Sequence, residues 1–104
     1  MTTVYVTAPE GDADELAETL VERRLAACVN VVDCESTYRW DGAVHSESER
    51  ILLIKTTADA YPALREAIEE LHPHDVPCIE RFKESDVPEA FADWVASNVS
   101  AVDS

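Results

Sequence analysis

The dipeptide Asp41-Gly42 restricts the fold of this chain more than any other feature, because it stands between two extended segments. Asp-Gly favours a tight type I′ turn, which joins two neighbouring antiparallel strands. A two-residue turn places Trp40 opposite Ala43. The same register places Tyr38 opposite His45, unless a bulge farther back changes the pairing. The sequence therefore predicts a long β-hairpin.

Hydrophobic periodicity predicts further elements on both sides of this hairpin. A capping-box pattern at Asp12 and Glu15 predicts that the first helix begins there. The expected order is a strand at 4–6, a helix from 12, the two hairpin strands, a helix from about 57 to 71, a strand at 78–82 and a last helix after 85–88. This order predicts an α+β, ferredoxin-like split βαβ domain over residues 1–104, with an added C-terminal helix. Two helices cover only one face of such a sheet, so the other face and the hairpin edge favour self-association.

The charge of the chain excludes two classes of partner. Its 22 acidic and 8 basic residues give a formal net charge of −14 at pH 7. Nucleic acid and anionic membranes both require clustered Lys and Arg, so neither is expected as a partner. A halophilic host explains the acid excess, and an acidic surface that collects cations explains it equally well.

The cysteines and the apolar runs bear on the compartment. Cys28, Cys34 and Cys78 form an odd set without C-x-x-C spacing, so free thiols in a reducing compartment are expected. No apolar run approaches the ~20 residues that span a bilayer. These features predict a cytoplasmic protein.

Five segments then resemble one known family in their order and spacing. They are Thr7-Ala8-Pro9, Arg24-Leu25-Ala26-Ala27-Cys28-Val29-Asn30, Tyr38-Arg39-Trp40-Asp41-Gly42, Glu49 through Thr56, and His72-Pro73 with Val76-Pro77. Together they resemble the CutA family of divalent-cation tolerance proteins. The resemblance implies a cytoplasmic homotrimer in which long hairpins extend one subunit's sheet onto the next, and which binds copper or a related ion. It also implies kinship with PII-type signalling proteins, which hold small ligands between subunits.

The metal ligands that the resemblance implies are only partly kept. Copper-binding members have a cysteine before Thr-Ala-Pro and two adjacent histidines before the proline, where this chain has Val6, Leu71 and His72. His74 and Cys78 lie close to the retained His72 in sequence, so these three residues are the candidate ligands for copper or zinc. Each also has a structural interpretation: a helix-terminal histidine, a solvated loop histidine and a thiol packed under the sheet.

Four other residues are candidates for a ligand cleft or an interface. Tyr38 and Trp40 can stack on a ligand or anchor a neighbouring subunit. Lys55 follows an apolar strand, and a buried pairing with a carboxylate such as Glu49 would serve the trimer or an anion in the cleft.

These observations leave two hypotheses for the function. The leading one is a trimeric divalent-cation tolerance protein that binds copper or a related ion, and the alternative is a PII-like sensor of a small anionic ligand. Catalysis is not expected, because no nucleophile and base stand at recognisable spacing and two glycines cannot form a phosphate loop.

Overall fold

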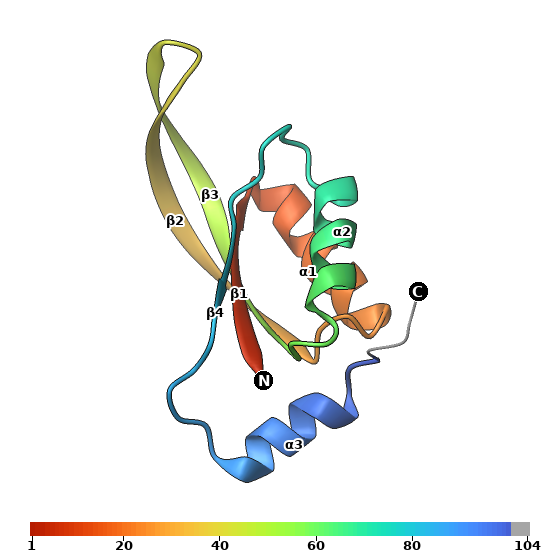
Figure 1. The fold of residues 1–104 in the computed structure, drawn as a ribbon. Helices are drawn as coiled ribbons and strands as arrows, with labels where there is room; N and C mark the ends of the chain where they lie inside the picture. The colour runs from red at the N-terminus through yellow and green to blue at the C-terminus, as the bar shows by residue number, and fades with distance from the viewer. Residues whose placement is uncertain (101–104) are drawn as a thin grey trace.

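The computed structural model describes residues 1–100, so residues 101–104 of the predicted domain lie outside it. The elements are β1 (Thr2–Ala8), α1 (Glu10–Glu22), β2 (Cys28–Trp40), β3 (Ala43–Thr56), α2 (Tyr61–Leu71), β4 (Ile79–Phe82) and α3 (Glu89–Ser97). The strands form one antiparallel sheet in the order β2-β3-β1-β4. The predicted α+β split βαβ fold with a C-terminal helix is confirmed (Figure 1).

The core lies between the sheet and the two helices α1 and α2, which cover the same face (Figure 1). Alternate residues of β1 and β3 point toward these helices and are fully buried, as period-2 alternation requires. The largest buried side chains of this layer are Val4, Val6, Leu20, Leu52, Ile54, Leu64 and Ile68. The helices thereby fix the sheet that carries the hairpin.

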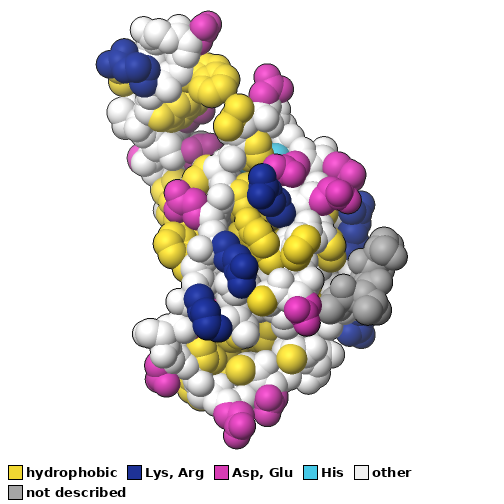
Figure 2. Space-filling model, viewed as in Figure 1, with side chains coloured by type: hydrophobic (Ala, Val, Ile, Leu, Met, Phe, Trp, Pro, Cys, Tyr) yellow, Lys and Arg dark blue, Asp and Glu magenta, His cyan; other side chains and the backbone are white. Residues whose placement is uncertain are grey.

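The opposite face of the sheet is partly apolar. Tyr5, Ile51 and Leu53 are half-buried there, while Val32 and Phe82 are exposed. Figure 2 shows hydrophobic side chains at the surface of both the hairpin and the body of the domain. We call the face that carries these five residues the open face.

The hairpin formed by β2 and β3 follows the predicted register. Pairing runs without a bulge from Cys28 opposite Lys55 to Trp40 opposite Ala43. Asp41 and Gly42 have φ of 54° and 81°, as the predicted type I′ turn requires. β1 pairs with residues 50–56 of β3, so within residues 1–100 no third strand pairs with the distal part of the hairpin, which projects from the body (Figure 1).

Arg50 stands at the base of this projection. Its guanidinium contacts Asp33 of β2 at 3.1 Å and Asp14 of α1 at 3.0 Å. The pair with Asp14 connects the hairpin to the helical layer, and the pair with Asp33 joins the two strands of the hairpin.

The predicted start of α1 was wrong. The helix begins at Glu10, with Pro9 at the N-cap position and no side-chain cap, so Asp12 and Glu15 form no capping box. The φ of Pro9 is −57°, close to the helical value, and Gly11 is tolerated in a first turn that tertiary packing stabilises. Among residues 1–100, no helix is long and apolar enough to cross a membrane.

Candidate cation-binding cleft

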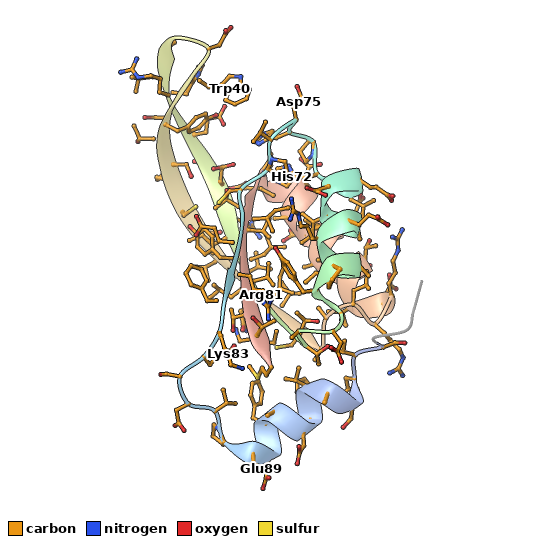
Figure 3. The ribbon with its side chains drawn as sticks, in the orientation of Figure 1. Trp40, His72, Asp75, Arg81, Lys83 and Glu89 are labelled. Carbon is orange, nitrogen blue, oxygen red and sulfur yellow. The ribbon has the colours of Figure 1, made fainter. Side chains whose placement is uncertain are left out.

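A cleft of about 630 Å³ lies between the hairpin and the loop of residues 73–78, which joins α2 to β4. Trp40 on the hairpin and Asp75 on the loop mark its two walls (Figure 3). Its lining residues are Ser36, Thr37, Tyr38, Trp40, Glu47 and Glu49 from the hairpin, Pro73, His74, Asp75, Val76 and Cys78 from the loop, and Thr7 from β1. The cleft therefore joins segments that are far apart in sequence.

The hairpin wall carries aromatic and acidic side chains on one face. Tyr38 and Trp40 alternate along β2, and the register places Glu47 diagonally opposite Tyr38. The Tyr38 hydroxyl donates a 2.6 Å hydrogen bond to Oε1 of Glu47, and its ring stacks on His45 with centroids 5.6 Å apart. The hydrogen bond to Glu47 is the main reason why the pKa of Tyr38 is raised to about 12. The carboxylate of Glu47 and the ring of Tyr38 are thereby held in place.

Glu49 is the buried acid of the cleft. Its exposed fraction is 6%, and it forms no hydrogen bond or ion pair with any residue from 1 to 100. Its charge adds to the causes that raise the pKa of Tyr38 and Cys78. Burial is the largest cause of the raised pKa of the Cys78 thiol, and the charge of Glu80 raises that pKa more than the charge of Glu49 does. A raised thiol pKa leaves less thiolate at neutral pH. The cleft is thus a region of negative potential around an unpartnered carboxylate.

The loop wall is positioned by His72, the C-cap residue of α2. His72 is 7% exposed, and its Nε2 donates to the carbonyl oxygen of Thr7 at 2.7 Å. Nδ1 accepts a hydrogen bond from the backbone N–H of His74 at 3.1 Å. An acceptor at Nδ1 and a donor at Nε2 define a neutral imidazole protonated at Nε2. Both nitrogens are therefore occupied, and the ring has no free lone pair for a metal ion.

Comparison with known proteins identifies the family. Residues 2–98 match the family model described as CutA1 divalent ion tolerance protein. The chain belongs to the CutA1 family. The "Divalent-cation tolerance protein CutA" of Thermus thermophilus is 42% identical over 97 residues, which cover 91% of this chain and 94% of the relative. The protein of the same name from Pyrococcus horikoshii is 38% identical over 96 residues, with coverage of 91% and 94%.

Solved structures of CutA proteins share the fold. The structure of the Thermus thermophilus protein has a TM-score of 0.90 at 42% identity and covers 96% of this chain and 100% of that chain. A structure described as the PII-like protein CutA from Nostoc sp. PCC 7120 has a TM-score of 0.94 at 28% identity, with coverage of 97% and 99%. The resemblance to the CutA family is therefore confirmed.

The CutA1 chain does not assemble the predicted metal ligands within one protomer. His74 and Cys78 line the cleft, whereas His72 binds the Thr7 carbonyl behind the loop wall. Within the described part of the chain, no three His, Cys, Asp or Glu side chains are placed to hold a metal ion. The residues present therefore do not fit a preformed site of three ligands from one subunit.

The residues predicted for a ligand cleft or an interface lie in two places. Tyr38, Trp40 and Glu49 share the cleft with His74 and Cys78. Lys55 lies on the same strand as Glu49 but farther along, at about 20 Å by strand geometry. The predicted pairing of Lys55 with Glu49 is therefore not formed within the chain.

Two acidic lining residues, Glu47 and Asp75, were missed by sequence reasoning. The predicted hairpin register could have identified Glu47, because strand alternation places it on the same face as Glu49. For Asp75 the sequence held no such signal, because only the tertiary fold brings the loop to the hairpin.

Proposed function

We propose that this CutA1-family protein acts in divalent-cation tolerance as a homotrimer, and that its cleft binds a divalent metal ion, copper first and zinc second. The observation that supports this proposal is the buried carboxylate of Glu49 in a cleft without any Lys or Arg among its lining residues. A buried charge is costly unless it is paired, so the cleft favours a cation.

The donors that face the cleft suit these ions in kind. Copper and zinc bind imidazole and thiolate, which His74 and Cys78 would supply, and Glu49 adds a carboxylate. Because these donors do not converge within one protomer, the proposal places the missing ligands on water or on a neighbouring subunit. Cys78 must lose its proton to bind, and its raised pKa makes that ligand the most pH-dependent of the set.

The proposed trimer is supported by the half-covered sheet. Val32 and Phe82 are exposed on the open face, and no third strand of the described chain pairs with the distal hairpin. Contact with a second copy would cover both features, since exposed apolar faces and free strand edges favour association. In this arrangement Trp40, which is 54% exposed, becomes an anchor at the neighbouring subunit.

The alternative function is that of a PII-like sensor of a small anion, and the likeness to the PII-like CutA of Nostoc favours it. The charge of the cleft opposes it, because Glu47, Glu49 and Asp75 all face the cavity. We propose a binding role rather than catalysis, and a reducing, cytoplasmic location in keeping with the three free cysteines.

Calorimetric titration with copper in molar salt tests the metal proposal, because salt removes diffuse binding to the acidic surface. We expect Glu49→Gln and Cys78→Ser each to weaken binding by about tenfold or more, with Glu66→Gln on the exposed face of α2 as the matched control. His72→Gln removes no donor from the cleft, so it should lose less copper affinity than Glu49→Gln or Cys78→Ser. Equal binding by all four variants would remove the cleft as the metal site, and saturable binding of a nucleotide instead would favour the PII-like alternative.

A further inference from the structure

We propose that the cleft also accepts a small organic ammonium ion, of the alkylamine or diamine class. The inference rests on the part of the proposed function that makes the cleft a cation site, and it does not depend on metal binding. Three features of the described residues carry it: aromatic walls, a buried unpartnered carboxylate, and acceptors that are spread out rather than convergent.

The aromatic walls favour an organic cation. Tyr38 and Trp40 are two residues apart on the same face of β2, which places their Cα atoms about 6–7 Å apart. The Tyr38 ring stacks on His45, and the Tyr38 side chain also lines the cleft. Figure 3 shows the indole of Trp40 extending from the hairpin toward the loop that carries Asp75. Ammonium groups bind the faces of such rings through the ring quadrupole, and methylene groups pack on the same surface.

The carboxylate of Glu49 supplies the charge that such a ligand would neutralise. Glu49 is 6% exposed as a residue, lines the cleft, and has no hydrogen-bonding or ionic partner among residues 1–100. Glu47 differs, because the Tyr38 hydroxyl already donates to it. An ammonium group carries N–H donors that Glu49 lacks within the chain, so binding would satisfy both the charge and the hydrogen bonds.

The spacing of the acceptors separates an ammonium ligand from a bare metal ion. A metal requires several donors within about 2.0–2.6 Å of one point, and among residues 1–100 no three suitable side chains meet that way. A cavity of about 630 Å³ is instead the size of small-molecule sites. A diamine would place one ammonium group at Glu49 and offer the second to another acid of the cleft, because Asp75 lines the same cavity as Tyr38 and Trp40.

The experiment uses the full chain with a chelator present, so that metal ions do not contribute. The probes are 1,4-diaminobutane, tetramethylammonium and the uncharged 1,4-butanediol, titrated by calorimetry at neutral pH and moderate salt. Because the chain has two tryptophans, a Trp94→Phe background makes Trp40 the only indole and its fluorescence a local reporter. Light scattering of each variant records the oligomeric state.

We expect saturable binding of both cations, a change in Trp40 emission, and no binding of the diol. Glu49→Gln should weaken diamine binding by at least about tenfold, because it removes the buried charge. Trp40→Leu, compared at a protein concentration where light scattering shows the same oligomer as the wild type, should weaken it by about three- to tenfold through loss of the cation–π contact. Glu66→Gln makes the same charge change at an exposed site on α2, and it should leave the affinity unchanged.

Three results would overturn the inference. Equal losses in Glu49→Gln and Glu66→Gln would show diffuse attraction to the acidic surface. Absence of amine binding in a protein that still binds copper would refute the ammonium ligand and leave the metal proposal intact. Absence of amine binding together with dissociation of the Glu49→Gln oligomer would show that a cationic side chain of a second copy fills the cleft.

Discussion

The Nε2 atom of His72 donates a 2.7 Å hydrogen bond to the carbonyl oxygen of Thr7, across 65 residues of sequence. This bond joins the end of α2 to β1 and fixes the start of the loop that forms one wall of the cleft. It also uses the nitrogen that a metal ion would need, so His72 serves the architecture of the site.

His72→Gln should lower the free energy of unfolding by about 1–3 kcal/mol, because the buried ring that bonds both the Thr7 carbonyl and the His74 N–H is lost. Urea denaturation checks this value, with His45→Gln on the exposed hairpin as the control. A His72 variant with unchanged stability but much weaker copper binding would contradict the structural role.

Trp40→Ala should weaken the proposed trimer by about 2 kcal/mol per contact, as expected for a large aromatic anchor. Trp94→Ala removes an indole of similar exposure from α3 and should leave the assembly intact. Light scattering over a range of concentrations distinguishes the two variants. A wild-type protein that is monomeric at micromolar concentration would refute the trimer itself.

The melting temperature should rise markedly between low and molar sodium chloride. The net charge of −14 creates self-repulsion in the folded state, which salt screens. Chloride is the salt of choice, because sulfate also strengthens apolar burial and would confuse the interpretation. A melting temperature that is indifferent to sodium chloride would count against a halophilic host.

The hydroxyl of Tyr38 should titrate at about 12, and Glu47→Gln should return its pKa toward the ordinary value. The proton is bound more tightly in the folded state, so the stabilising contribution is complete below the unfolded pKa of about 10 and is lost as pH rises through the folded value. NMR of isotope-labelled tyrosine follows the titration. Glu35→Gln, on the other face of the hairpin, is the control, and an equal effect in both variants would exclude the specific hydrogen bond.

The hairpin was predictable because one local signal determined it. Asp41-Gly42 selects the turn, the turn selects the register, and the register extends unbroken to Cys28 and Lys55. The prediction that α1 begins at Asp12 was wrong because the capping-box signal there is weak. Packing of Leu16 and Leu20 against the sheet decides where the helix lies.

The cleft was only half predictable. Tyr38, Trp40 and Glu49 were expected at a ligand site, and the alternation of a strand brings them to one face. The role of His72 could not be read from its neighbours in sequence, because its partner Thr7 lies on β1. The placement of His74 and Cys78 opposite Tyr38 likewise depends on the sheet order, which is a property of the whole fold.

The two walls of the cleft differ in how firmly they are held. His72 ties the loop to β1, whereas the distal hairpin, beyond the ion pair of Arg50 with Asp14, pairs with no third strand among residues 1–100. A distal hairpin without a third strand is free to tilt in an isolated protomer, and assembly would reduce that freedom. Ligand binding and assembly would then be reciprocally linked, since each removes conformational entropy that the other would otherwise have to remove. The apparent affinity of the cleft should therefore increase with protein concentration, and a saturating ligand should slow the exchange of subunits between trimers.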